Sequence, residues 1–146
     1  MKIDQTWQWL GYLGLLPFAF FLWFSDTTLK IISYNLPYDS KHAFVFYSAI
    51  ILSFLAGNLW PKDTQKKQVA LPLLSNLFCL YAFICLLLPL FLALILLGFG
   101  YLSIFLIEYI LCKDNDISYS KNYFSMRLPL TIFVCLFHFY ALFSWF

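Results

Sequence analysis

Four long stretches with almost no charged residue dominate this sequence. They cover residues 7–24, 43–60, 69–112 and 128–146, and the only charged residue within them is Glu108. A helix that crosses a bilayer needs about 20 mostly apolar residues to traverse about 30 Å of hydrocarbon. The first, second and fourth stretches have 18, 18 and 19 residues, so each one fits a single crossing.

The third stretch is 44 residues long and must fold back on itself. As one helix it would extend for about 66 Å, twice the thickness of the hydrocarbon. Pro89 is the natural break, because proline lacks the N–H group that a continuous helix needs. We therefore predict helices near 71–88 and 90–112. The fold class is then all-α, a polytopic membrane bundle of five transmembrane helices in one integral membrane domain over residues 1–146.

Composition excludes the soluble classes of protein. Hydrophobic residues make up 63% of the chain and charged residues 11%, against about 45–50% and about 25% in ordinary soluble domains. A soluble chain of this size could not bury that much apolar surface. The net charge of +2 gives no electrostatic footprint for nucleic acid. The lipid bilayer is the expected partner, and no nucleic acid is expected.

Basic residues are divided unequally between the two sides of a five-span topology. One side receives seven of the nine and the other two; the seven are Lys2, Lys62, Lys66, Lys67, Lys113, Lys121 and Arg127, and the two are Lys30 and Lys41. A four-span topology divides them four against five. Because positive residues concentrate on the cytoplasmic side, we predict five spans, with the N-terminus in the cytoplasm and the C-terminus outside.

Glu108 and His138 are ionisable residues inside predicted spans, which makes them functional candidates by default. Glu108 can reach the cytoplasmic interface or pair with Lys113 or Arg127, so an anchoring role is favoured over a proton relay. His138 fits a neutral side chain hydrogen-bonded to a neighbouring helix; with Cys135 on the same face, the alternative is a metal or haem ligand pair. Glu108 and His138 lie about 10 Å apart along the membrane normal, so no contact between them is expected.

The four cysteines all fall within predicted spans, and none forms a CxxC pair. They are Cys79, Cys85, Cys112 and Cys135. Buried cysteine commonly acts as a small apolar filler, and one histidine with scattered cysteines is a weak metal pattern. We predict no metal, no cofactor, no catalytic residue and no disulfide framework.

Small residues on two helices predict close helix packing. Ala49, Ser53 and Gly57 recur every four residues, which is the small-xxx-small pattern that lets membrane helices approach closely. Gly11 and Gly14 offer a similar flat patch on the first helix. We expect these five residues to serve helix packing.

Three further residues complete the set of ligand-binding candidates with Glu108 and His138. Pro17 lies inside the first span and should kink it, freeing the carbonyl of Leu13. Asn58 is polar and lies near the end of the second span, where it suits an interhelical hydrogen bond. Trp60 ends that span at the interface, where tryptophan is enriched.

Three motifs, read together, resemble a known family. They are residues 10–18 (LGYLGLLPF), 47–57 (YSAIILSFLAG) and 127–131 (RLPLT). Their order and spacing are similar to those of small bacterial membrane proteins catalogued as a domain of unknown function, with a mitochondrial relative called transmembrane protein 69. The resemblance covers nearly the whole chain. It implies a compact helical bundle in the bacterial inner membrane and implies no known activity.

The sequence departs from the family pattern after the second motif. There the family usually has a basic residue or histidine shortly before a tryptophan. This chain keeps Trp60 but has Leu59 at the polar position. Any role of that polar side chain is therefore in doubt here, and Asn58 is a possible substitute one position away.

Three functions compete on this basis. The first is a non-enzymatic membrane component: an assembly factor, a small subunit or a homo-oligomer, whose partner is another membrane protein or a second copy. The alternative is a binder or carrier of an apolar small molecule such as a lipid, quinone or tetrapyrrole, with a pocket near Pro17, Asn58 and His138. A membrane enzyme ranks third, because it would need Glu108, His138 and Asn58 to converge on one cavity.

Overall fold

The computed structural model describes residues 11–23, 40–59, 70–114 and 121–146. Within these ranges the regular structure is helical, without a strand. The five helices are α2 (Leu16–Trp23), α4 (Ser40–Gly57), α5 (Ala70–Leu86), α6 (Leu90–Asp114) and α7 (Lys121–Trp145). The all-α class predicted from the sequence is confirmed.

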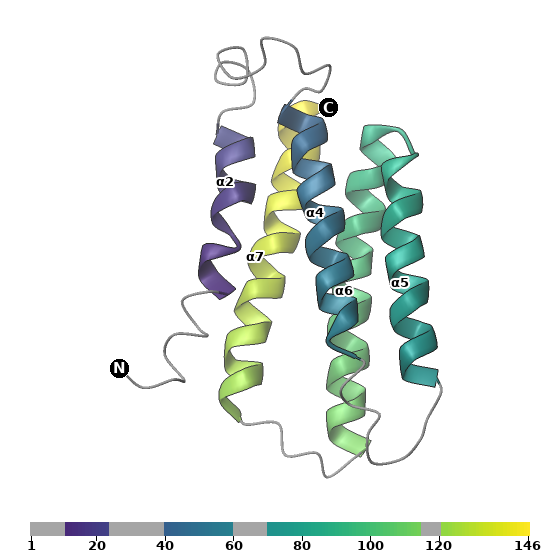
Figure 1. The fold of residues 1–146 in the computed structure, drawn as a ribbon. Coiled ribbons are helices and arrows are strands. Elements are labelled where there is room, and N and C mark those ends of the chain that lie inside the picture. The colour runs from purple at the N-terminus through teal and green to yellow at the C-terminus, as the bar shows by residue number, and fades with distance from the viewer. Residues whose placement is uncertain (1–10, 24–39, 60–69, 115–120) are drawn as a thin grey trace.

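The helices form an up-and-down bundle in which successive helices run antiparallel (Figure 1). Helix α4 lies at the centre and packs against α2, α5 and α6, whereas α7 packs against α6 and α2. Residues of α4, α6 and α7 that are distant in sequence therefore face one another inside the bundle. This arrangement positions the polar interior described below.

Three helices are long and apolar enough to cross a membrane. They are residues Ser40–Gly57, Leu90–Leu111 and Ser125–Trp145. Two shorter apolar helices, Gly11–Trp23 and Leu71–Leu86, accompany them. Five helices are thus present in the described ranges, and three of them meet the requirement for a span by length and composition.

The first helix differs from the expected span over 7–24. Its helical turns are interrupted at Gly14 and Leu15, and α2 proper begins at Leu16. Pro17 consequently lies in the first turn of α2, where a missing N–H costs nothing because it has no intrahelical acceptor. The chain breaks before Pro17 instead of bending through it. The hydroxyl of Tyr47 on α4 donates to the freed carbonyl of Gly14 at 2.9 Å.

The turn predicted at Pro89 is present. Helix α5 ends at Leu86, α6 begins at Leu90, and the N–H of Ala93 donates to the carbonyl of Pro89 at 3.0 Å. Proline thus stands just before the helix, where its fixed φ is compatible with helix entry. The long apolar stretch folds into an antiparallel pair at this point.

The last helix begins seven residues before the predicted start at residue 128, and α6 continues to Asp114. The polar segment assigned to a loop over 113–126 is therefore partly helical. The apolar stretch predicts where hydrocarbon begins, whereas a helix satisfies its own backbone hydrogen bonds and can continue into the polar interface. Pro129 is tolerated inside α7 near this polar end.

Several polar side chains lie within the apolar core of this bundle, and many large apolar side chains also lie on its outer surface. Ser48, Glu108, Arg127, Thr131 and His138 are buried. Large apolar side chains face outward along the helices, among them Trp23, Ile50, Phe54, Leu87, Phe139 and Phe143. Water would penalise this distribution, whereas lipid tails solvate it. The fold is compatible with a membrane protein.

Candidate functional site

His138 lies at the junction of three helices. Its Nε2 is 2.8 Å from the hydroxyl of Ser48 on α4, and its Nδ1 is 2.8 Å from the carbonyl of Val134 on α7. The hydroxyl of Tyr101 on α6 donates to the carbonyl of Ser48 at 2.8 Å. These bonds tie α4, α6 and α7 together, and they match the interhelical hydrogen bond expected of a neutral histidine.

The carbonyl of Val134 fixes the tautomer of His138. A carbonyl can only accept, so Nδ1 carries the proton. Nε2 of the neutral ring is then an acceptor, and the Ser48 hydroxyl donates to it. The imidazole is 2% exposed, and a buried charge here would have to be paired. The geometry satisfies both ring nitrogens without a charge.

Aromatic rings enclose this histidine. The centroids of Phe44, Tyr101 and Phe18 lie 5.1, 5.6 and 6.0 Å from the centroid of the imidazole. His138 thus joins neighbouring helices through its hydrogen bonds and ring contacts. Cys135, three residues earlier, approaches the carbonyl of Gly98 on α6 with its Sγ at 4.0 Å. The two side chains therefore have different partners and do not form a shared ligand pair.

Glu108 and Arg127 form a buried ion pair between α6 and α7. The Nε of Arg127 donates to Oε2 of Glu108 at 2.9 Å, and the two side chains are 8% and 0% exposed. This is one of the two pairings expected of Glu108. Thr131 donates from its hydroxyl to the carbonyl of Arg127 at 3.0 Å, which supports the turn of α7 that holds the arginine.

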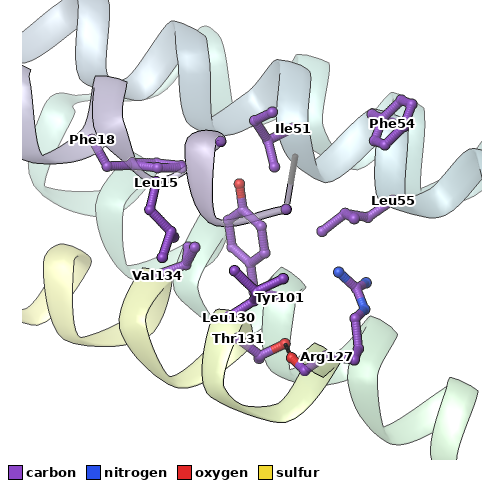
Figure 2. A pocket seen from close by; sticks show the side chains of 12 residues that line it. Leu15, Phe18, Ile51, Phe54, Leu55, Tyr101, Arg127, Leu130, Thr131 and Val134 are labelled. Atoms are coloured by element: carbon purple, nitrogen blue, oxygen red, sulfur yellow. Dashed lines mark hydrogen bonds between the residues drawn. The ribbon is translucent and has the colours of Figure 1, made fainter. Parts of the chain in front are cut away.

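A pocket of about 160 Å³ lies beside this ion pair (Figure 2). It is enclosed by α2, its preceding turn, α4, α6 and α7, and it is partly open to the outside of the bundle. Its lining is mostly apolar, with Leu15 and Phe18 on one side and Ile51, Leu55 and Leu130 on others. Figure 2 shows the guanidinium of Arg127 extending from α7 toward Leu55.

The structure separates the residues proposed as one ligand site. Phe18 lines the pocket next to Pro17, but Pro17, Asn58 and His138 do not line it. Asn58 is half-buried in the turn that follows α4, and its N–H donates to the carbonyl of Leu55 at 3.2 Å. Trp60 lies outside the described residues. Ligand binding by these residues stays a prediction.

Three residues of the site were not singled out as site residues by the sequence. Ser48 and Tyr101 hydrogen-bond at the centre of the bundle. Arg127 was counted among the basic residues of the predicted cytoplasmic side and named as one of two partners for Glu108, but not as a site residue. Ser48 and Tyr101 carry a detectable signal, because each places a hydroxyl near the middle of a predicted span. Arg127 could also have been identified from the sequence, because this charged residue directly precedes the last apolar stretch.

The small residues of α4 lie in different environments. Ala49 is buried, and the hydroxyl of Ser53 donates to its carbonyl at 2.9 Å. The Sγ of Cys79 on α5 approaches the Ser53 carbonyl at 3.8 Å, so this face meets α5. Gly57 is exposed at the end of α4, and a Cβ there would meet nothing within 4 Å among the described residues.

The glycines of the first helix lie near α7 and the pocket. Gly11 and Gly14 both line the pocket. A Cβ on Gly11 would come within 3.0 Å of Leu130 on α7, so the small residue allows a close approach between the two segments.

Metal-binding clusters are absent from the described part of the chain. No group of three or more His, Cys, Asp or Glu side chains gathers in these ranges. Cys79, Cys85 and Cys135 are free thiols. Glu108 bonds to Arg127, and His138 bonds to Ser48 and Val134.

Comparison with known proteins gives one match. No curated protein and no solved structure matches the chain. One family model, described as a protein of unknown function (DUF3429), matches residues 3–143. This match extends over nearly the whole sequence and covers α2, α4, α5, α6 and all but the last two residues of α7. The chain therefore belongs to the DUF3429 family of proteins of unknown function.

Proposed function

We propose that this chain crosses the bacterial inner membrane five times and is related to mitochondrial transmembrane protein 69. The outward apolar side chains and the three helices of spanning length support a membrane location. The shorter helices α2 and α5 are apolar and lie beside the longer ones, which supports two further crossings. The unequal distribution of basic residues supports a cytoplasmic N-terminus and an external C-terminus.

The function that the geometry supports best is binding of a small apolar molecule taken from the bilayer. The observation that carries it is the pocket between α2, α4, α6 and α7. At about 160 Å³ it matches the size of engineered apolar cavities that bind a ring the size of benzene. It therefore fits one ring or the first part of a lipid tail, while its open side lets the remainder lie in the membrane.

A pocket-filling variant tests this function. Leu55 lines the pocket, so Leu55→Trp should fill it, whereas Ile50→Trp on the lipid-facing side of the same helix should not. Protein purified in mild detergent is examined by native mass spectrometry and absorbance. We expect a bound lipid, quinone or porphyrin in the wild type and in Ile50→Trp, and its loss in Leu55→Trp. A wild-type protein without any bound molecule would contradict the proposal.

A second candidate is a non-enzymatic membrane component, either an assembly factor, a small subunit or a homo-oligomer. The observation in its favour is an open apolar groove along α2 and α7, flanked by Trp23, Phe139, Tyr140 and Phe143. The same native mass spectra test it. A second protein chain, or a second copy, retained at fixed stoichiometry would favour this candidate over ligand binding.

A further inference from the structure

The terminal nitrogens of Arg127 belong to a buried side chain and have no acceptor among the described residues. A guanidinium has five N–H donors, and the one on Nε is used by Glu108. In the described part of the chain, neither Nη atom has a hydrogen-bond partner. The side chain is 8% exposed and lines the pocket. Because a buried donor without a partner is costly, this edge of the guanidinium is suited to a ligand acceptor.

We infer that the pocket binds an uncharged amphiphile through a carbonyl oxygen that accepts hydrogen bonds from the Nη atoms of Arg127. This inference rests on the proposed binding function and narrows its ligand class. The apolar walls would hold the part of the ligand next to the carbonyl. Two kinds of membrane molecule carry such a carbonyl oxygen: a lipid with an acyl ester, and a quinone.

Charge balance selects a neutral ligand. Arg127 and Glu108 already cancel each other at 2.9 Å. A carboxylate or phosphate in the pocket would add an uncompensated negative charge in an apolar setting close to Glu108, and such a charge is expensive to bury. A carbonyl oxygen satisfies the N–H donors and adds no charge. The walls contribute few other polar atoms, which fits a ligand with a single polar end.

The position of Arg127 agrees with the depth of an ester group. It lies six residues after the start of α7 and directly before the apolar run that begins at Leu128. Six residues of helix correspond to about 9 Å. The guanidinium therefore lies near the boundary between the polar interface and the hydrocarbon, where the acyl esters of lipids reside.

Matched probes test the inference without a mutation. Delipidated full-length protein is titrated with dioctanoylglycerol and with dioctylglycerol, the ether analogue that lacks both carbonyls, and binding is followed by native mass spectrometry. We expect the ester to bind about tenfold more tightly than the ether, because only the ester offers a carbonyl oxygen to the charged donor and an ether oxygen is a weaker acceptor. Equal binding of the two would overturn the inference and leave the proposed function intact.

Further probes separate the sources and the competing chemistry. Tighter binding of decylubiquinone than of dioctanoylglycerol would identify the quinone as the source. If decanoate binds more tightly than both dioctanoylglycerol and decylubiquinone, the pocket prefers an anion, and the inference of a neutral ligand is overturned. Binding of none of the four probes would overturn both the inference and the proposed function.

Arg127→Lys then assigns the effect to the guanidinium. Lysine keeps a positive charge for Glu108 but lacks the planar pair of terminal nitrogens. We expect its affinity for the ether to equal that of the wild type and its ester preference to vanish. An unchanged ester preference in this variant would contradict the role given to Arg127, and unchanged ether binding shows that the variant is folded.

Discussion

Glu108 and Arg127 are buried as a pair, so the effect of each substitution depends on the group that remains. Arg127→Met would leave the carboxylate of Glu108 buried and without this cation. Loss of one partner of a buried ion pair costs about 3–5 kcal/mol. We expect a reduction of that order in the free energy of unfolding, measured in detergent by tryptophan fluorescence.

The double variant separates this penalty from the value of the pair itself. Combining Glu108→Gln with Arg127→Met removes both charges, so no uncompensated ion remains inside the bundle. We expect the double variant to be more stable than Arg127→Met alone, as seen when both members of buried pairs are replaced. If the loss of unfolding free energy in the double variant equals the sum of the losses in Glu108→Gln and Arg127→Met, the two groups do not interact.

At the same scale, the sequence predicted the chemistry of this interior in part. Glu108 and His138 were identified because ionisable side chains within apolar runs are rare. Their partners Arg127 and Ser48 come from other helices. Arg127 was one of the two cations expected beside Glu108, whereas spacing along the sequence cannot select Ser48 as the partner of His138. A hydroxyl such as that of Ser48 is also common in membrane helices, where it can bond to its own backbone. Only the packing of α4 against α6 and α7 shows what it binds.

At the scale of the helices, Gly100 of α6 lies close to side chains of α4 and α5. A Cβ there would lie 2.7 Å from Leu52 and 3.0 Å from Tyr81, whereas a Cβ on Gly98 would meet His138 at 3.8 Å, an ordinary contact. We expect Gly100→Ala to lower the free energy of unfolding by about 1–3 kcal/mol, because a methyl is forced into filled space.

Gly98→Ala is the matched control on the same helix. There the new methyl has room, and alanine is preferred over glycine inside helices by about 0.5–1 kcal/mol. We expect an unchanged or slightly higher free energy of unfolding when both variants are measured in detergent by tryptophan fluorescence. Equal destabilisation by the two alanines would mean that α6 does not approach α4 at Gly100 as the structure has it.

Helix boundaries show what apolar patterning can and cannot predict. The break at Pro89 follows from local chemistry, since proline lacks the N–H group that a continuous helix needs. The interruption at Gly14 depends on Tyr47 of another helix, which supplies the hydrogen bond to the exposed carbonyl. The early start of α7 at Lys121 has a different cause, because polar residues can be helical outside hydrocarbon. Hydropathy therefore predicted the number and order of helices better than their ends.

Across the whole molecule, the structure changes the charge count on which the orientation depends. Arg127 is buried against Glu108 and is not a free loop charge. Removing it from the seven basic residues on the predicted cytoplasmic side leaves six, against Lys30 and Lys41 on the other side. The remaining bias still favours a cytoplasmic N-terminus for five spans.

Reporter fusions to the full chain test this orientation. Alkaline phosphatase is active only outside the cytoplasm, and green fluorescent protein is fluorescent inside it. We expect high phosphatase activity and low fluorescence for fusions after Phe146, and fluorescence for a fusion before Met1. Replacing Lys62, Lys66 and Lys67 with glutamine leaves three basic residues on the cytoplasmic side against two on the other, and should produce mixed orientation, because basic residues set topology. A fluorescent C-terminal fusion in the wild type would place both termini in the cytoplasm and contradict the five-span proposal.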